Sequence, residues 1–416
     1  MRNSKITTLN VSYLFCFMMM VLMIFPGLYR NTPNIIIGVV ILGWLITAHI
    51  GVRKITITKP IMAATIYILY ILIYKFIGYS EVIINKYFQL ILFWVPIYVL
   101  TYYVRNGVND KNKKLLDALL ISYNISFISN IVIMVRDPLA TLMYNRTGGE
   151  HYLLTNIGET PYSFVGSLLF VFSYYQIRKK NASKRWLYLC TIITSATMMA
   201  LMQRTITLIL SIIALVVYYY LKNTYRKRLG KKLVWSLLAI GALIFLYYEY
   251  NNIVSLVVPL IHNDRIADRL FEFGNMFFKG NTAIVNRSGE VRVEYFNYSI
   301  RTWLQNYRTF LFGIGYLDMR NVSNTYIIGG HSELFDSLAR HGIIGTVLMF
   351  NAMIKAFMYM YKSIKIKDKY IFIVLLILFF AYAVISSYTD YPYIGVTAFF
   401  FIPLLLWDES MEGVIL

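Results

Sequence analysis

The feature that most constrains this chain is a series of apolar stretches, each about as long as one membrane crossing. About twelve such runs lie near residues 10–29, 33–51, 60–79, 86–104, 115–135, 161–177, 186–203, 205–221, 233–250, 342–361, 370–388 and 392–407. A helix needs about 20 apolar residues to cross the hydrocarbon core of a bilayer. Of the 416 residues, 58% are hydrophobic and only 14% are charged, whereas soluble domains carry about 25% charged residues. The sequence therefore predicts an all-α, polytopic integral membrane protein with about twelve transmembrane helices.

The basic residues indicate how these helices are oriented. More than half of the 40 Lys and Arg residues lie in six short connecting segments: the one before the first apolar run and then every second connection between runs. These connections lie near residues 2–5, 53–59, 105–114, 178–185, 222–232 and 362–369. Short cytoplasmic loops carry an excess of Lys and Arg, so we expect this side and both termini to be cytoplasmic. Because the net charge of +20 is spread over six loops, it argues against a nucleic-acid surface.

One arginine lies where a charge is costly. Residues 186–221 form a run of 36 residues in which Arg204 is the only charged residue. A single helix of that length would measure roughly 54 Å, far more than a hydrocarbon core of about 30 Å. The run is therefore predicted to be two helices that turn near Arg204 on the outer side. Arg204 either reaches to lipid headgroups, as interfacial arginines do, or grips a phosphate or pyrophosphate in fork geometry.

Two long connections, at residues 136–160 and 251–341, lie on the outer side. Loops of this length are usually functional or disordered, although a passive cover is the alternative. In the first loop, Arg146 precedes two glycines and Asn156 lies just before the next run, which alone is compatible with an ordinary turn. We expect three parts: transmembrane helices in residues 1–250, a large outer loop at 251–341, and the last helices in 342–416.

The large outer loop contains the pattern of an amphipathic helix over residues 290–311. Apolar residues recur there at helical spacing: Val291, Tyr295, Tyr298, Trp303 and Tyr307. Such a helix is typical of a segment lying at the membrane surface, and we expect it to end at the Gly313-Ile314-Gly315 segment. Arg287 and Arg292 flank its start, and a helix N-terminus with arginines nearby can bind an anion.

A segment with two histidines, two acids and an arginine follows, GGHSELFDSLARHGIIG at residues 329–345. Its pattern predicts a short helix from His331 to His341, in which Asp336 can pair with Arg340 one turn later. Two glycines then let the chain enter the next apolar run in close packing. A neutral His331 at the start of this helix could accept a proton from a sugar hydroxyl; a hydrogen-bonded structural histidine is the alternative.

These patches together resemble a known family. HSELFDSLARHGIIG is similar to the His-containing signature of the bacterial O-antigen polymerase and O-antigen ligase superfamily. The order of the other patches agrees with that family: Arg146, Gly149 and Asn156; Arg204 at a tight outer turn; and Arg292, or less closely Arg287, before the helix that ends in G-x-G. The ligase branch usually has Asn, Ser or Gln two residues after the histidine. Glu333 stands there in this chain, which favours a polymerase of O-antigen or capsular polysaccharide.

The resemblance implies a membrane fold like that of GT-C glycosyltransferases, and an active site on the outer face of the bacterial inner membrane. The donor would be an oligosaccharide linked to undecaprenyl pyrophosphate, and the acceptor the non-reducing end of another lipid-linked repeat unit. His331 and Glu333 would be the catalytic pair, with Glu333 as an acid, a base or an orienting group; a helix-start acid is the structural alternative. The arginines would stabilise the leaving pyrophosphate. Arg204 and Arg292 are the main candidates, and the other substrate-binding candidates are Arg146, Asn156, Arg287 and Arg340.

No metal or cofactor is expected, because guanidinium groups can supply the positive charge and the outer loops lack a D-x-D pair. A flippase and a chain-length regulator are the protein partners that the resemblance implies. The rival interpretations are a ligase with a different acceptor, a transporter of lipid-linked glycans and a membrane scaffold without catalysis. Transporters often contain inverted repeats, and no repeat is evident in this sequence.

Overall fold

The computed structural model describes residues 2–49, 57–77, 84–136, 160–179, 184–202, 205–224, 287–315, 328–330 and 332–407. This described part is helical, and its only β-type pairing is an isolated bridge between Ile364 and Trp407. Eleven of the predicted apolar runs lie largely within it, and each coincides with a helix or with a set of consecutive helices. The run at 233–250 lies outside the described residues. The prediction of an all-α fold is therefore confirmed for the described part of the chain.

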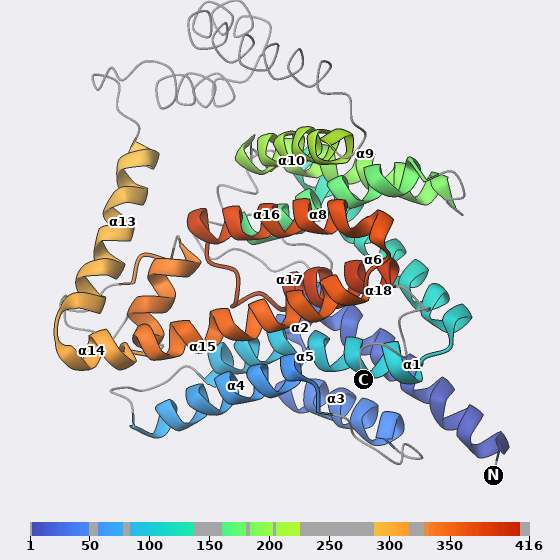
Figure 1. Ribbon diagram of the computed structural model, residues 1–416, viewed down its shortest axis with the longest axis horizontal. Coiled ribbons are helices and arrows are strands. Elements are labelled where there is room, and N and C mark those ends of the chain that lie inside the picture. Colours follow the sequence, from blue (N-terminus) through green and yellow to red (C-terminus); the bar gives the residue numbers. More distant parts are fainter. Residues whose placement is uncertain are drawn as a thin grey trace, which may run out of the picture.

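The helices are arranged side by side in one bundle, with α13 and α14 at one end of it (Figure 1). Their bounds are α1 Arg2–Ile24, α2 Pro26–Asn31, α3 Asn34–His49, α4 Lys59–Ile77, α5 Ile84–Asn106, α6 Asn109–Arg136, α8 Thr160–Ile177, α9 Arg185–Leu201, α10 Thr205–Thr224, α13 Arg287–Leu304, α14 Tyr307–Phe312, α15 Glu333–Ser363, η3 Ile366–Asp368, α16 Lys369–Ile385, α17 Pro392–Val396, η4 Thr397–Phe401 and α18 Ile402–Leu406. The helices α9 and α10 are separate, as the single arginine at 204 led us to expect. Residues 203 and 204 themselves lie outside the described part.

Three helical segments of the described part are long and apolar enough to cross a membrane: Phe88–Asn106 in α5, α6 and α15. Six more apolar helical segments are shorter, at Leu9–Ile24, Asn34–His49, Lys59–Ile73, Arg185–Leu201, Thr207–Lys222 and Pro392–Leu406. Many large apolar side chains face outward, as on α3, where Ile35 is 76% exposed and Val39 is 59% exposed. Such a surface suits lipid rather than water, which supports membrane association.

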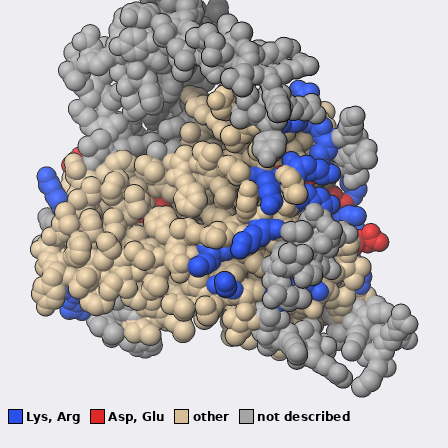
Figure 2. Space-filling view, in the orientation of Figure 1, with Lys and Arg blue, Asp and Glu red and all other residues tan. Residues whose placement is uncertain are grey.

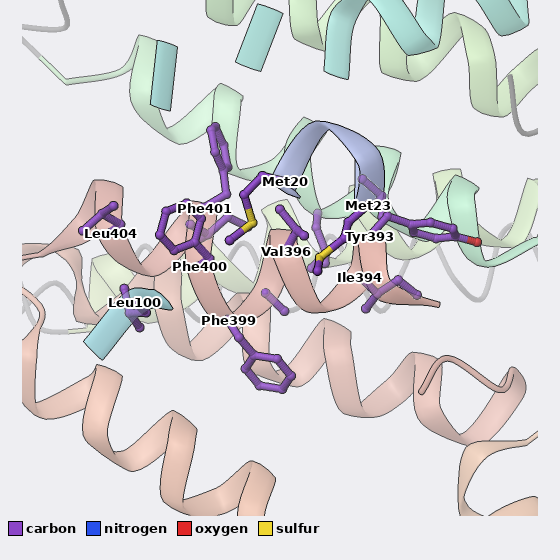
Figure 3. Packing of buried hydrophobic residues seen from close by; sticks show 14 of the residues in the cluster. Met20, Met23, Leu100, Tyr393, Ile394, Val396, Phe399, Phe400, Phe401 and Leu404 are labelled. Atoms are coloured by element: carbon purple, nitrogen blue, oxygen red, sulfur yellow. The ribbon is translucent and has the colours of Figure 1, made fainter. Parts of the chain in front are cut away.

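The centre of the bundle is formed by α17, η4 and α18. Figure 3 shows their aromatic side chains packed against methionines of α1 and against Leu100 of α5. Gly395 of α17 lies so close to the backbone of Phe93 that a Cβ would collide with it. The buried η4 segment has π-helical pairing, and Tyr123 of α6 hydrogen-bonds there to Thr397 at 2.7 Å. This central segment therefore joins α1, α5 and α6 into one packed body.

Buried polar groups also connect the helices. The side chain of Asn124 on α6 donates to the hydroxyl of Thr191 on α9 at 2.8 Å and accepts from Thr194 at 2.9 Å. The hydroxyl of Tyr103 on α5 donates to the backbone oxygen of Ser12 on α1 at 2.9 Å. Between helices in lipid, close packing and such hydrogen bonds replace the hydrophobic driving force that operates in water.

The amphipathic segment of the large loop differs from its prediction. A single helix over 290–311 was expected, but α13 ends at Leu304 and α14 begins at Tyr307. Asn306 causes the break, because its side chain accepts from the amide of Thr309 in a capping box. Tyr307, one of the apolar residues of the pattern, is 82% exposed, whereas Ser299 is fully buried against α15. In Figure 1, α13 and α14 lie at the end of the bundle where α15 begins.

Candidate functional site

The structure describes only some of the residues that the sequence analysis identified as candidates. Four of them lie outside the described residues: His331, Arg204, Arg146 and Asn156. Arg287 and Arg292 belong to the first two turns of α13, but their side chains lie outside the described part. Glu333 and Arg340, both on α15, are described in full. The described part of the candidate site consists of the first residues of α15 and the residues that contact them.

Glu333 is the first residue of α15, and its side chain is completely buried. One carboxylate oxygen accepts from the amides of Tyr388 at 2.6 Å and Thr389 at 3.0 Å, and from the hydroxyl of Ser387 at 3.3 Å. The other accepts from the hydroxyls of Thr389 at 2.6 Å and Ser337 at 3.0 Å. A buried carboxylate needs such donors because burial removes its hydration. These contacts occupy both oxygens and join α15 to the loop between α16 and α17.

Asp336, one turn later, holds the segment that leads into α15. One of its oxygens accepts from the hydroxyl of Ser299 on α13 at 2.7 Å and from the amide of Gly330 at 3.2 Å. The other accepts from the amide of Ser332 at 3.1 Å, and the oxygen of Ser299 in turn accepts from the amide of Gly329 at 3.0 Å. The chain on both sides of position 331 is thus fixed between α13 and α15.

Arg340 has a different partner from the one expected. The helical spacing predicted a pair with Asp336, but the guanidinium of Arg340 lies 3.3 Å from a carboxylate oxygen of Asp390. It also lies within 3.4 Å of the hydroxyl of Ser387. Asp336 is occupied by the two amides and the hydroxyl described above, and Asp390 reaches Arg340 from the loop before α17. The pair is largely buried, so Arg340 ties α15 to this loop a second time.

The G-x-G segment after α14 completes a helix end. Gly342 adopts φ 62° and ψ −174°, which breaks α15 after its first nine residues. Breaking a helix leaves backbone carbonyls without intrahelical partners. The amide of Ile314 donates to the carbonyl of Ala339 at 2.9 Å, and the amide of Gly315 donates to that of Arg340 at 2.7 Å. The G-x-G segment is thus a cap for this helix end rather than a nucleotide-binding loop.

Two other features make this break specific. The hydroxyl of Tyr70 on α4 donates to the carbonyl of His341 at 2.9 Å, next to the two capped carbonyls. Gly313 has φ 74°, and a Cβ at this position would collide with the backbone of Arg340 and Gly342. Only glycine adopts such a backbone conformation and approach without strain. The bend in α15 is therefore determined by α4 and by the chain after α14.

The second histidine of the motif belongs to the core. His341 is 3% exposed, and its ring meets the ring of Tyr67 edge-on at 5.9 Å. Tyr67 in turn lies edge-on against Trp94 at 5.5 Å. The surroundings of His341 are thus mainly aromatic, on the side of α15 that faces α4 and α5. Of the two histidines in the motif, His331 remains the candidate for catalysis.

Sequence reasoning missed the loop of Ser387, Thr389 and Asp390, which supplies most of the partners of Glu333 and Arg340. One signal could have identified it. Asp390 is the only charged residue between positions 370 and 407, just as Arg204 is the only one in its own run. A single charge in an apolar region usually has a specific partner. Ser299 gave no such signal, because its role depends on the packing of α13 against α15.

The arrangement can hold a short loop in a fixed place at the start of α15, a helix long and apolar enough to cross a membrane. Within the described ranges, no group of three or more His, Cys, Asp or Glu residues is placed to hold a metal ion. A scan against models of protein families and a search of curated proteins find no match to this chain. The sequence motifs and the geometry of this site are therefore what indicates a function.

Proposed function

We propose that the chain is a glycosyltransferase that polymerises lipid-linked polysaccharide repeat units at the outer face of the bacterial cytoplasmic membrane. It transfers the growing glycan from polyprenyl pyrophosphate to the non-reducing end of another lipid-linked repeat unit. The observation that supports this most is the fixed segment on both sides of position 331, where Asp336 binds the amides of Gly330 and Ser332. A general base is effective only when it is held within reach of the proton it removes.

In the proposed reaction, the acceptor hydroxyl oxygen bonds to the anomeric carbon of the donor glycan. The bond between that carbon and the pyrophosphate oxygen breaks, and its electron pair leaves with the pyrophosphate. His331 takes the hydroxyl proton. It lies two residues before the first residue of α15. A neutral imidazole can accept this proton.

The leaving pyrophosphate needs positive charge where its own charge develops. Position 292 lies seven residues before Ser299 on α13, which is about two helical turns, roughly 10 Å, on the same helical face. Position 287 lies about a third of a turn away from that face. Because Ser299 contacts Asp336, we assign the principal role on α13 to Arg292. Arg204, between α9 and α10, is the second principal cation, and Arg146, Asn156 and Arg287 support both.

Glu333 and Arg340 act as positioning residues in this proposal. Glu333 accepts five hydrogen bonds from Ser337 and from the loop before α17, which leaves it poorly suited to exchange a proton with substrate. Of the roles that the sequence offered for Glu333, its contacts support orientation. Arg340 is paired with Asp390. Both residues keep the start of α15 against its neighbours.

The test is a reconstituted reaction. The purified chain is incubated with its isolated lipid-linked repeat unit, with and without chelator, and the products are separated on a gel. We expect a ladder of products that survives chelator and disappears in His331→Ala and Arg204→Ala. Arg301→Ala is the matched control, because Arg301 is exposed on α13 and half a turn away from position 292. It should retain the ladder.

Other results would replace the proposal. A ladder that survives His331→Ala would remove the catalytic role of this histidine. A single transfer to some other acceptor, without a ladder, would identify a ligase. Lipid-linked substrate that crosses the membrane without being joined would identify a transporter.

A further inference from the structure

A groove lies between α15 and α16, at the opposite end of α15 from Glu333. Its volume is about 350 Å³, and its lining is apolar apart from one lysine, Lys362. Phe357 and Met358 contribute from α15, and Leu376 and Phe380 from α16. Met358 is 50% exposed, so the groove opens on the outer surface of the helix pair. Between helices of a membrane protein, such an opening faces the acyl chains of lipids.

The end of this groove is positively charged. Lys362 lines it, and the amino group of Lys369 lies 4.6 Å from the ring centroid of Tyr361, another lining residue. Lys365 and Lys367 follow in the same connection. In Figure 2, Lys and Arg side chains gather toward the side where this end of α15 lies in Figure 1.

The one acid of the connection does not compensate this charge. Asp368 is 1% exposed and points into the protein, where Lys179 binds one of its carboxylate oxygens at 2.9 Å. The hydroxyl of Tyr175 donates to its other oxygen. The acid is therefore already paired with a cation that follows α8. Among the described residues, no ion pair engages Lys362 or Lys369.

We propose that this groove binds one acyl chain of an anionic phospholipid, whose headgroup phosphate is held by Lys362 and Lys369. The apolar lining fits the chain, and the lysines at one end complement the phosphate. A zwitterionic lipid could fill the same space, but its neutral headgroup would be attracted less strongly by the lysines. A Lys near an anionic membrane contributes roughly a fivefold gain in binding. The groove lies at the end of α15 away from the candidate site, and lipid binding there does not depend on the reaction proposed above.

Brominated lipids can test this in the full-length protein. Met358→Trp places a fluorophore at the rim of the groove, and Val216→Trp, at a residue 58% exposed on α10, is the matched control near another basic end. Ile354→Trp is a second rim probe in case the first variant does not fold. Each variant is reconstituted in mixtures of brominated phosphatidylglycerol or brominated phosphatidylcholine with unlabelled phosphatidylcholine. The signal of the native tryptophans is subtracted.

We expect phosphatidylglycerol to be preferred about fivefold more strongly at the rim probes than at Val216→Trp. Lys362→Gln combined with Lys369→Gln should abolish the difference, whereas Lys222→Gln, on α10, should leave it unchanged. Equal preference at both positions, or a preference that survives the double substitution, would overturn the proposal. So would rim probes that neither lipid quenches, because another protein helix would then cover the groove.

Discussion

The two ends of α15 use buried carboxylates in different ways. Near Glu333 and Asp336, at the first end, most donors are uncharged amides and hydroxyls. At the other end, Asp368 is bound by the ammonium of Lys179 and by a tyrosine hydroxyl. Amides and hydroxyls hold a carboxylate in a fixed direction and thereby shape the loops that supply them. An ion pair with a partly exposed lysine mainly balances charge.

Basic residues at that second end share a further feature, which is contact with tyrosine rings. The pairs are Lys179 with Tyr175, Arg178 with Tyr174, Lys222 with Tyr218, Lys369 with Tyr361 and Lys111 with Tyr13, at 4.6–6.0 Å from the ring centroid. All these basic residues belong to the connections that the charge pattern placed on the cytoplasmic side. Tyrosine and lysine together are typical of a membrane interface. The comparison suggests that one end of α15 is built for precise geometry and the other for anchoring.

The largest expected effect is on stability at the end of α15 near Glu333 and Asp336. Glu333→Ala removes the acceptor of two buried amides and three hydroxyls. A buried donor left without a partner costs about 1–3 kcal/mol, so we expect the free energy of unfolding to fall by at least about 3 kcal/mol. Unfolding in mixed detergent micelles measures this change. Glu333→Gln should lose less, since it keeps one carbonyl oxygen, and an Ala variant as stable as wild type would refute the positioning role of Glu333.

The next effect separates geometry from stability. Asp336→Asn keeps the size of the side chain but replaces one acceptor oxygen with an NH2 group, which cannot accept a hydrogen bond. The variant therefore loses either the bond from the Ser332 amide or the bonds from Ser299 and Gly330. We expect the rate of glycan transfer to fall about a hundredfold, the loss typical of a misplaced catalytic group. The thermal midpoint in detergent should change little. A rate that falls only with the folded fraction would mean that Asp336 serves the fold alone.

A smaller difference is expected between two arginines of one helix. Because position 292 shares the helical face of Ser299, Arg292→Ala should lower the rate about tenfold more than Arg287→Ala. Initial rates at saturating substrate test this, with Arg301→Ala as the control that stays near wild type. Equal losses at 287 and 292 would contradict the assigned face of α13.

The smallest effect is expected at the other end of α15, near Asp368 and Lys179. Lys179 is 27% exposed, whereas its partner Asp368 is 1% exposed. Lys179→Gln keeps a hydrogen-bond donor but removes the charge, so we expect the free energy of unfolding to fall by about 1–2 kcal/mol, less than for Glu333→Ala, and glycan transfer to stay unchanged. The same unfolding and rate assays apply. A loss as large as that of Glu333→Ala would erase the contrast between the two ends.

Much of the fold could be predicted because an apolar run leaves the chain few options in a membrane. The positions of α3, α4 and α16 followed from this rule alone. The break between α13 and α14 did not, because the capping box of Asn306 acts against an otherwise continuous helical pattern. The contact of α13 with α15 also could not be predicted. Ser299, a small polar residue, lies where the backbone of Gly329 and the side chain of Asp336 approach α13 closely.

Several residues of the candidate site could be predicted from the sequence, but most of their contacts could not. The motif at 329–345 led to Glu333 and to the glycine that bends α15. The pairing of Arg340 could not be obtained from local spacing, because Asp390 is 50 residues away and reaches it only through the packing of α15 and α16. Helical spacing favours Asp336 as the partner, but that carboxylate instead accepts hydrogen bonds from the amides of Gly330 and Ser332. Contacts between distant segments are what local patterns cannot supply.

The central claim is that Asp336 acts by holding His331, and a double-mutant cycle tests it directly. The rate of glycan transfer is measured for wild type, Asp336→Asn, His331→Ala and the double variant under single-turnover conditions. Two residues that act as one unit show strongly non-additive losses. We predict that Asp336→Asn costs about a hundredfold in the wild-type background and less than about twofold when His331 is absent. An equal loss in both backgrounds would contradict the account.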